Sequence, residues 1–378
     1  MKIKYKAPLL LLGATIITAS ITGYSNYENN VTLIEDAKMS ELKGVATQIQ
    51  NDLIAQGNNA AAKVALVIDR PDIKAAFRAH DREKLIKLML PVFKTLKNKF
   101  GVRESQFNLP PATVFLRLHN LPLFGDDNSA FREMILLSFK NQKGYQGLEV
   151  GRSGINIRAI EPVKDDNGII GNFEIGQSFS TILEDIKKNT NFEAAIFVND
   201  ELMTKVATSR PRAGPERIFG DLQGIGATDW TKVLPYVDAE SLNKINDITL
   251  QTKHIKGNDY GMIFMPLLDF NNKEIGTIVA ISDYSNYQQQ LKATLVNSIF
   301  FAVFQIILLS GVMMITFRSL ILRPINHFNK IINLWLNGEQ DKGMGTITAK
   351  EDEMGELANN FEKLYRKHMA TKGDNECH

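Results

Sequence analysis

Two apolar stretches without charged residues divide the chain into three parts. The first covers residues 7–24 and the second covers residues 294–317. A helix rises ~1.5 Å per residue, so the second stretch is long enough to cross a ~30 Å hydrocarbon layer. We therefore expect a transmembrane helix at 294–317, preceded by an outer region at 25–293.

The first stretch allows two interpretations. It follows a lysine-rich start and contains Ala19-Ser20, an acceptable cleavage site for a signal peptide. It also approaches spanning length, and small residues recur every fourth position on one face, which suits helix packing in a membrane. We favour an uncleaved anchor; the small residues are Ala14, Thr18 and Thr22.

Positive charges flank the two stretches on the same side. By the positive-inside rule both termini are then cytoplasmic, and the chain crosses the inner membrane twice with its sensor region periplasmic or extracellular. The charges are Lys2, Lys4 and Lys6 before the first stretch, and Arg318, Arg323 and Lys330 after the second.

Residues 28–56 follow a helical pattern, because apolar residues recur at spacings of three and four. Such a helix suits a dimerising stalk, or it packs on its own domain, and the two roles are compatible. The apolar positions are Val31, Ile34, Leu42, Val45, Ile49 and Leu53.

The outer region then predicts a first αβ module. Residues 60–100 form helices, and residues 113–119 alternate at period two, with Val114, Leu116 and Leu118 on one face and Phe115, Arg117 and His119 on the other. A helix near 130–140 leads to strands at 147–150, 155–163 and 169–175. The turn at 166–168, Asp-Asn-Gly, is typical of a hairpin.

A second module repeats this order. A helix at 181–188 leads to a strand at 194–198, an irregular segment at 209–226, and strands at 260–267 and 275–282. The closing hairpins of the two modules match, about 104 residues apart. Pro162-Val163 of the first corresponds to Pro266-Leu267 of the second, and Ile170-Gly171 corresponds to Ile275-Gly276. This self-similarity predicts two copies of one sensor unit, a distal module at about 58–180 and a proximal module at about 190–285.

Behind the second span, two short heptad segments predict a helical relay. Each has an apolar seam at spacings of three and four, and each is too short to be stable alone, so we expect two chains to form a parallel four-helix bundle as a homodimer. Gln305 lies near the middle of the span and needs a partner, either in a second copy or at Thr15 or Thr18 of its own chain. The seams are Ile325, Phe328, Ile332 and Trp335, then Met354, Leu357, Phe361 and Leu364.

Two motifs in this relay resemble a HAMP domain. Arg323-Pro324-Ile325 opens the first helix, and Asp352-Glu353-Met354-Gly355-Glu356-Leu357 opens the second, with a glycine-containing connector between them. The resemblance covers residues 318–370 and implies a signalling relay, with residues 1–6 and 371–378 as cytoplasmic tails.

The outer region resembles the double Cache sensor domains of bacterial chemoreceptors and sensor kinases over residues 28–290. The similar segments are Phe-Leu-Arg-Leu-His (115–119), Gly-Asp-Asp (125–127), Gly-Leu-Glu-Val-Gly-Arg-Ser-Gly (147–154), Ile-Arg-x-x-x-Pro-Val (157–163) and Ile-Gly-x-x-Glu-x-Gly (170–176). The resemblance implies an α+β fold: a long N-terminal helix, two tandem PAS-like (Cache) modules, two transmembrane helices and a HAMP coiled coil, with the ligand usually in the distal module.

Charged residues on the predicted distal strands and turns form a candidate ligand site. An arginine fork binds a carboxylate through two hydrogen bonds, and a neighbouring acid can hold an amine, so a small carboxylate or amino-acid-like solute would fit. The alternative is an ion-pair network that only fixes the sheet, and ordinary core packing is favoured for Tyr260, Met262 and Phe264. The candidates are Arg117, His119, Asp126, Asp127, Arg132, Glu149, Arg158 and Glu174.

The composition argues against several other functions. A formal charge of +2 gives no reason to expect nucleic acid, and one cysteine excludes an intrachain disulfide. The sequence lacks G-x-S-x-G, H-E-x-x-H and P-loop motifs, so we expect no enzyme activity, catalytic residue, metal or cofactor. His368 lies where a sensor kinase would have its phosphoacceptor helix, but we expect a surface or seam histidine.

These features predict a transmembrane receptor for a small solute, acting in chemotaxis or signal transduction. The alternatives are the input module of a sensor kinase or diguanylate cyclase system, a tethered protein that binds a periplasmic protein, and an anchored hydrolase. No output domain is recognisable, so the chain is a truncated receptor, pairs with a full-length receptor, or contacts a separate cytoplasmic signalling protein.

Overall fold

The computed structural model describes residues 3–210, 212–242, 245, 247–337 and 353–375. It divides into two compact units. One unit comprises Ile34–Gln289, and the other comprises Met1–Leu33 with Gln290–His378. The first of these units contains the outer region, and the second contains the apolar helices and the relay.

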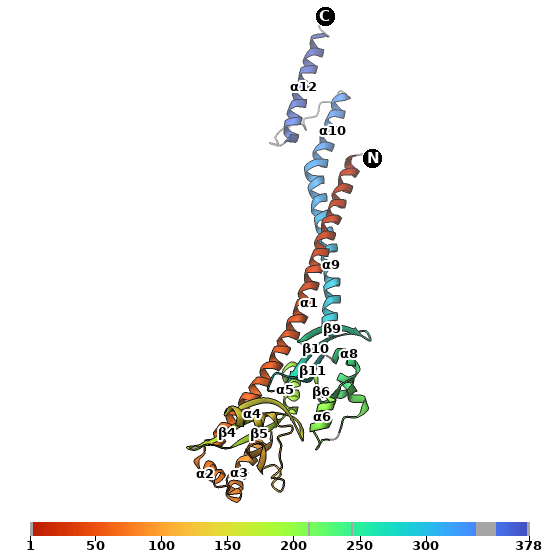
Figure 1. Ribbon diagram of the computed structural model, residues 1–378. Helices are drawn as coiled ribbons and strands as arrows, with labels where there is room; N and C mark the ends of the chain where they lie inside the picture. Colours follow the sequence, from red (N-terminus) through yellow and green to blue (C-terminus); the bar gives the residue numbers. More distant parts are fainter. Residues whose placement is uncertain (1–2, 211, 243–244, 246, 338–352, 376–378) are drawn as a thin grey trace. The chain divides into compact units, whose positions relative to one another are not determined.

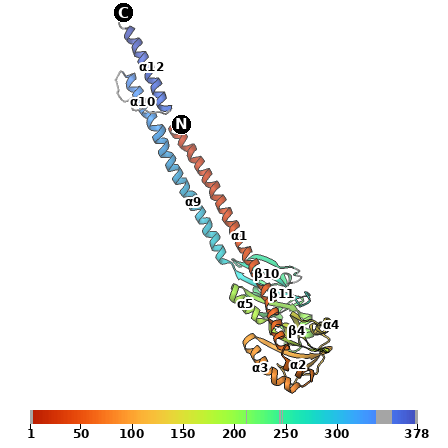
Figure 2. The same ribbon diagram turned by 90° about the vertical axis from the view of Figure 1, so that its left-hand side faces the viewer.

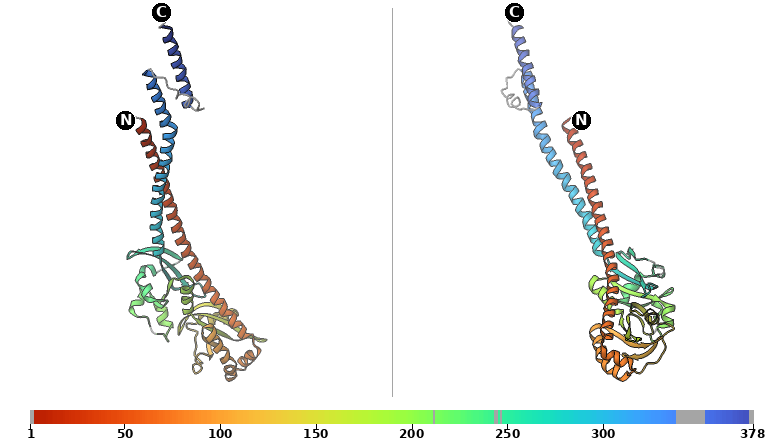
Figure 3. Two further views of the ribbon diagram at one scale, coloured as in Figure 1. Left: turned by 180° about the vertical axis from the view of Figure 1, so that it is seen from behind. Right: turned by 60° about the vertical axis from the view of Figure 1, so that its left-hand side comes forward.

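The unit 34–289 contains two antiparallel sheets that follow one another along helix α1 (Ile3–Ile68) (Figures 1 and 3). The first sheet has the strand order β2-β1-β5-β4-β3. Together with helices α2, α3 and α4 it forms what we call the first module. Its strands are β1 (Val102–Leu109), β2 (Thr113–Arg117), β3 (Tyr145–Gly151), β4 (Gly154–Asp165) and β5 (Gly168–Ser178).

One face of the first sheet packs on helices. The C-terminal turns of α1, α2 (Pro71–Arg78) and α3 (Arg82–Phe100) bury apolar side chains against Phe107, Phe173 and Ile175. Pro71 begins α2, where its missing N–H costs nothing, and the Asp81 side chain accepts the Lys84 N–H to cap α3. The opposite face is covered by α4 (Glu133–Asn141).

The second sheet has the order β7-β8-β6-β11-β10-β9 and forms the second module with its own helices. One face packs on α1 and α5, and the other on α7, η2 and α8. The elements are α5 (Ser180–Thr190), β6 (Glu193–Asn199), α6 (Asp200–Val206), η1 (Pro215–Arg217), β7 (Ile218–Phe219), β8 (Leu222–Ala227), α7 (Trp230–Val233), η2 (Leu234–Tyr236), α8 (Ala239–Leu242), β9 (Thr249–Ile255), β10 (Asn258–Leu268) and β11 (Glu274–Asp283).

The two sheets share a central arrangement, as the sequence repeat predicts. In the first sheet Pro162 pairs with Asn172 across β4 and β5, and in the second Pro266 pairs with Thr277 across β10 and β11. In both sheets the second strand of this hairpin pairs with the first strand of the sheet in chain order: β5 pairs with β1, and β11 pairs with β6. Two tandem modules on one long helix therefore form the outer region.

The stalk helix packs on its own domain. Leu42, Val45 and Ile49 are buried in the core of the second module, and α1 continues without interruption from the N-terminal apolar stretch to the first module. Lys38, also on α1, is buried beside Asp259 and bonded to Glu35.

The second unit contains α1 up to Leu33 and the helices of the C-terminal part of the chain. Within this unit, α1 and α9 (Ser285–Phe317) lie side by side (Figure 2). Two described helices, one in each of these regions, are long and apolar enough to cross a membrane. A π-helical turn, η3 (Arg318–Leu322), leads from α9 to α10 (Arg323–Leu336), and α12 (Glu353–Asn375) follows.

Four strands and one face assignment differ from the sequence predictions. Strands β1, β7, β8 and β9 were not expected. Phe115 packs beside Phe77 in the same core as Leu116 and Leu118, although strict alternation puts it on the face of Arg117. A register shift in the β1–β2 pairing, between Phe107 and Asn108, interrupts the alternation there.

Candidate ligand site in the first module

The α4-facing side of the first sheet carries buried polar side chains where a core is usually apolar. This side carries Glu104 and Gln106 of β1, Arg158 of β4 and Glu174 of β5. Gln106 pairs with Glu174 across β1 and β5. Glu104 and Arg158 flank β5 on its two sides, because each of them pairs with Gly176. Arg158 and Glu174 are each 1% exposed. Buried charges are rare unless they are paired, so their partners define the site.

Arg132, at the N-cap position of α4, bridges two strands. Its Nε donates to Oε2 of Glu149 at 2.8 Å, and its Nη2 donates to Oε2 of Glu174. The other Glu149 oxygen accepts the backbone N–H of Met134 at 2.9 Å. These bonds fix the start of α4 over the sheet.

Arg158 is the second cation of this cluster. Its Nη2 lies 2.7 Å from Oε2 of Glu104, its Nε lies 3.8 Å from Glu149, and its Nη1 lies 3.9 Å from Oε1 of Glu174. We call Glu104, Arg132, Glu149, Arg158 and Glu174 the inner cluster. It holds three carboxylates and two guanidinium groups, so it carries one excess negative charge.

Several polar atoms of this face lack hydrogen bonds within the described part of the chain. They are Oε1 of Glu174, Nε of Arg158 and Nδ2 of Asn172, and all are buried. An amide chain runs beside them, from Gln106 to Asn108 at 2.9 Å and from Asn108 to Asn172 at 2.8 Å. An unpaired buried polar group costs about 1–3 kcal/mol, so these atoms leave hydrogen-bonding capacity unused on this face.

The cluster stabilises the charged forms of Glu104 and Arg132. Burial alone would raise the pKa of Glu104, but the charge of Arg158 and the hydrogen bond from Ser153 outweigh burial and lower the pKa to about 2. Burial alone would lower the pKa of Arg132, but the charges of Glu149 and Glu174 raise it. Electrostatic attraction therefore dominates desolvation at this site.

A second group lies at the end of β2. Nη1 and Nη2 of Arg117 bind the two oxygens of Asp126 at 2.6 Å each, and Arg152 reaches the same carboxylate at 2.9 Å. Arg117 is 5% exposed and pairs with Gln106 in the sheet. Asp126 therefore ties the loop after β2 to the sheet and to the β3–β4 turn.

Two predicted site residues lie outside both groups. The Asp127 side chain is exposed and accepts the N–H and Oγ–H of Ser129, which is a turn contact. His119 is exposed at the end of β2, where its Nδ1 lies 3.2 Å from the Ser105 amide nitrogen. The other six predicted residues do come together. The inner cluster contains Arg132, Glu149, Arg158 and Glu174, and the second group contains Arg117 and Asp126.

Sequence reasoning missed other members of this face. Glu104, Gln106 and Asn108 lie on the unexpected strand β1, and Asn172 lies on the predicted strand β5. A period-two repeat of polar residues at 104, 106 and 108 was the available signal. Within the described ranges, no group of three or more His, Cys, Asp or Glu side chains is arranged to hold a metal ion.

The corresponding face of the second module is mainly apolar, although it also carries the buried Glu193 and Thr277. Met262 and Phe264 are fully buried there beside Phe197 and Val279, so core packing holds for these two residues. Tyr260 is partly buried against the same core, and its ring centroid lies 4.3 Å from that of Tyr236, with the rings tilted by 37°. The hydrogen bond between the two hydroxyls, with burial, raises the pKa of Tyr236 to about 12.

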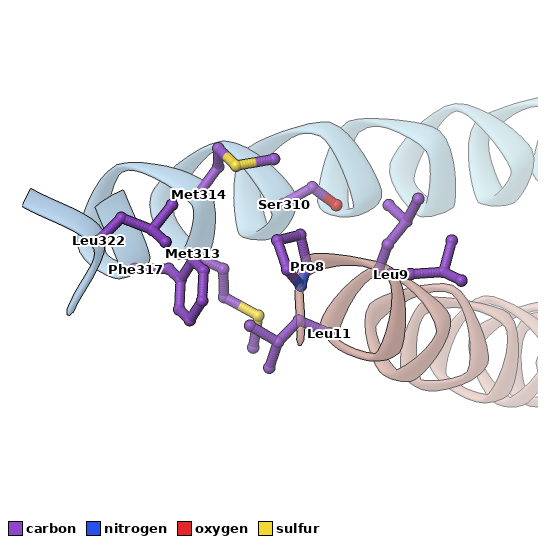
Figure 4. Close-up of a pocket in the computed structure, with 9 residues that line it drawn as sticks. Pro8, Leu9, Leu11, Ser310, Met313, Met314, Phe317 and Leu322 are labelled. Carbon is purple, nitrogen blue, oxygen red and sulfur yellow. The ribbon is translucent and has the colours of Figure 1, made fainter. Parts of the chain in front are cut away.

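In the other unit, Gln305 finds its partner within the chain. Its Oε1 accepts the Thr22 hydroxyl at 3.0 Å, one turn beyond the expected Thr18, and Thr15 lies 3.3 Å from Ser310. Nearer the N-terminus, Met313 extends from α9 toward Leu11 of α1 at the edge of an apolar cavity of about 450 Å³ (Figure 4).

The relay helices α10 and α12 pack on one another. Phe328, Ile331 and Trp335 of α10 meet Ala358 and Phe361 of α12. Ile331, not the predicted Ile332, is the fully buried position, while Ile325, Leu357 and Leu364 are exposed. Pro324 is buried at the first turn of α10, Glu353, Gly355 and Glu356 lie in the first turn of α12, and Asp352 and the Met354 side chain lie outside the described residues.

Comparison with known proteins identifies related sensor domains. The family profile described as the double sensory domain of two-component sensor kinases, dCache_3, matches residues 37–288. No curated protein sequence matches this chain.

Among solved structures, sensor domains are similar to this chain at low identity and low TM-score. The ligand-binding domain of the Campylobacter jejuni chemoreceptor Tlp3 in complex with 4-methylisoleucine is 11% identical, with 70% of this chain and 94% of that chain covered and a TM-score of 0.42. The extracellular domain of the histidine kinase vpHK1S-Z8 is 15% identical, with 70% and 96% covered and a TM-score of 0.39. The sensor domain of the Vibrio cholerae histidine kinase DctB is 12% identical, with 68% and 98% covered and a TM-score of 0.42.

Proposed function

Because this chain belongs to the dCache_3 family of double sensory domains, we propose that it is a transmembrane receptor for a small extracytoplasmic solute. The first module binds the solute, and a conformational signal passes through α9 to the relay helices. The observation that carries this proposal is the inner cluster, which buries a carboxylate oxygen of Glu174 without a hydrogen bond among the described residues.

The charge pattern of this face indicates the class of solute. The inner cluster has one excess negative charge and an unused acceptor on Glu174, so it favours an ammonium group. Arg117 lies in the same row of the sheet, two strands from Glu174, with Gln106 between them. Strands are ~4.8 Å apart, so a solute with an amino group at one end and a carboxylate at the other suits this row.

Both apolar helices cross the membrane in this proposal, and both termini are cytoplasmic. Apolar side chains are exposed along both helices, such as Ile16 at 43% and Phe300 at 65%, which suits a lipid environment. The relay acts as a HAMP-like bundle of two chains, and the exposed Ile325, Leu357 and Leu364 supply apolar surface for the second copy. The family description favours a sensor kinase as the output over a chemoreceptor or cyclase.

Ligand titration tests the sensing role. Amino acids, small amines and small carboxylates are added to the full chain in detergent, and the melting temperature is recorded. A ligand at 100 times its Kd stabilises the folded state by about 2.7 kcal/mol, so an amino-acid-like solute should raise Tm. Glu174→Gln should abolish the shift, whereas the exposed Glu216→Gln should keep it. A shift that survives Glu174→Gln would contradict this site, and no shift from the panel would contradict the sensing role.

Thiol labelling tests the topology. In intact spheroplasts, Cys377 should resist a membrane-impermeant maleimide and react only after permeabilisation. A single cysteine at Lys256 in a Cys377→Ser background should react at once. Labelling of Cys377 in intact cells would contradict the two-span arrangement.

A further inference from the structure

One of the contacts between the two modules is made by the tip of the β10–β11 hairpin. The backbone N–H of Phe270, in the turn of this hairpin, donates to the carbonyl oxygen of Leu148 on β3 at 3.0 Å. This hydrogen bond joins the second module to a strand of the first. Leu148 directly precedes Glu149, which is a member of the inner cluster.

The Phe270 side chain enters the first module at the base of α4. Its ring lies 5.9 Å from that of Tyr145, edge to face, and it packs in a small core with Met134, Ile135 and Ile160. Met134 is the residue whose N–H is held by Glu149. The ring therefore contacts the helix that the inner cluster positions.

Gly147 gives Phe270 this access. Its φ of +139° suits glycine, and a Cβ at this position would lie 2.9 Å from Phe270 Cβ and 3.0 Å from its Cα. The turn is also rigid, because Oδ1 of Asp269 accepts the N–H groups of Asn271 and Lys273 at 2.8 and 2.9 Å. Motion of β3 or α4 is thus transmitted to the hairpin and not absorbed by its turn.

The Phe270 contact is one of several between the modules. Leu148 and Ile157 of the first sheet also pack in one core with Met265 of the second, and the carbonyl oxygen of Arg152 accepts the Ser209 N–H at 2.9 Å. A groove of about 480 Å³ lies beside the Phe270 contact, lined by residues of α1, β3 and the hairpin. The hairpin leads directly to the output helix, because β11 ends at Asp283, whose side chain accepts the Ser285 N–H at 2.8 Å at the start of α9.

We propose that Phe270 is the coupling residue through which the first module acts on α9. Rearrangement of the inner cluster shifts α4 and β3, the hairpin follows through Phe270, and β11 carries the displacement to Asp283. The competing routes are α1, which packs on both sheets, and the core that the two modules share. The biological meaning of this inference rests on the proposed sensing role, but its test uses substitutions instead of a ligand, so the two can fail separately.

The test measures amide hydrogen exchange of residues 283–293 in the full chain in nanodiscs. Glu149→Gln perturbs the inner cluster beside Leu148, and it should change exchange at 283–293 by about fivefold or more, the lower range of typical coupling between sites. In a Phe270→Ala background the same substitution should leave exchange at 283–293 unchanged. Phe270→Tyr should preserve the coupling, because the ring and the backbone bond both remain.

Two further variants complete the design. Lys273→Ala, in the same turn with an exposed side chain, is the matched control and should keep full coupling. Gly147→Ala, on the other side of the contact, should reduce coupling as Phe270→Ala does. If Glu149→Gln unfolds the first module, Glu174→Gln replaces it. Coupling that persists in Phe270→Ala would overturn the proposal in favour of α1 or the shared core, and an absence of coupling in the parent chain would overturn it as well.

Discussion

The two modules place different residues at equivalent positions of the same sheet. Ile160 pairs with Glu174 in the first module, and Phe264 pairs with Val279 at the corresponding point of the second. One step along, Arg158 corresponds to Met262. In both modules these residues lie on the face opposite α1, so the first module buries charges where the second buries apolar side chains.

This difference separates two roles within one fold. Apolar burial stabilises a sheet at about 25 cal/mol per Å², whereas buried ion pairs are often no better than apolar residues of similar size. The second module is therefore built for stability, which suits a rigid connection to α9. The first module gives up part of that stability for a polar surface with unused hydrogen-bonding atoms, which suits a site that must respond to a solute.

The largest effect is expected from moving the charge into the second module. Met262→Arg buries a guanidinium among Phe197, Phe264 and Val279. Glu193 lies two strands away in the same row of the sheet, but it already binds Lys187 and Lys232. We expect a loss of more than about 5 kcal/mol, or no folded second module. Urea unfolding followed by Trp230 fluorescence measures this, and Met262→Leu is the control, with a loss below about 1.5 kcal/mol. Tolerance of Met262→Arg would show that the second face also accepts charge.

The reverse exchange in the first module should cost less. Arg158→Met leaves Glu104 without its main partner and increases the negative charge of the inner cluster, so we expect a loss of about 3–5 kcal/mol. Adding Glu104→Gln removes the unpaired charge and should restore part of the stability. Hydrogen exchange of β4 and β5 reports the local free energy, with the exposed Arg103→Ala as control. A neutral effect of Arg158→Met would mean that the ion pairs contribute nothing to the first module.

The hairpins of both modules could be predicted because their pattern and turns agree. Residues 155–163 and 169–175 are rich in apolar residues and flank Asp166-Asn167-Gly168, and the structure has β4 and β5 there. Strand β1 could not be found in this way. Its positions toward α4, Glu104, Gln106 and Asn108, are polar, so only Val102 and Phe107 on the other face follow the usual relation between burial and apolarity.

The site was predictable in residue type but not in its pairing. Arg132, Glu149, Arg158 and Glu174 stood out as charges on predicted strands and at a helix start, and the structure brings them together. Sequence alone does not show that Glu149 holds both Arg132 and Met134, because this depends on how α4 crosses the sheet. Asp127 and Asp126 are adjacent and chemically alike, yet only Asp126 faces Arg117.

Acid should weaken the first module through Glu104. Its pKa is about 2 in the folded chain and 4.5 when unperturbed, so its stabilising effect is complete above about pH 4.5 and is lost as pH falls toward 2. The loss amounts to up to about 3 kcal/mol. Glu104→Gln should therefore flatten the dependence of β4 and β5 stability on pH in this range, and the exposed Glu216→Gln should not. An unchanged slope in Glu104→Gln would show that the charge of Glu104 does not stabilise the fold.

The smallest effect on stability is expected from replacing the buried amides of the first sheet with apolar side chains. Gln106, Asn108 and Asn172 are buried amides bonded mainly to one another, and replacing all three with leucine makes this strip of the first sheet resemble the second. Because both partners of each hydrogen bond are removed together, the free energy of unfolding should change by less than about 1 kcal/mol. Urea unfolding measures this, and ligand-induced Tm shifts should disappear in the same variant, since the polar surface is gone. A loss well above 1 kcal/mol would mean that the amides are needed to hold the sheet together, and then the polar face would be a structural feature of the first module instead of a surface reserved for a solute.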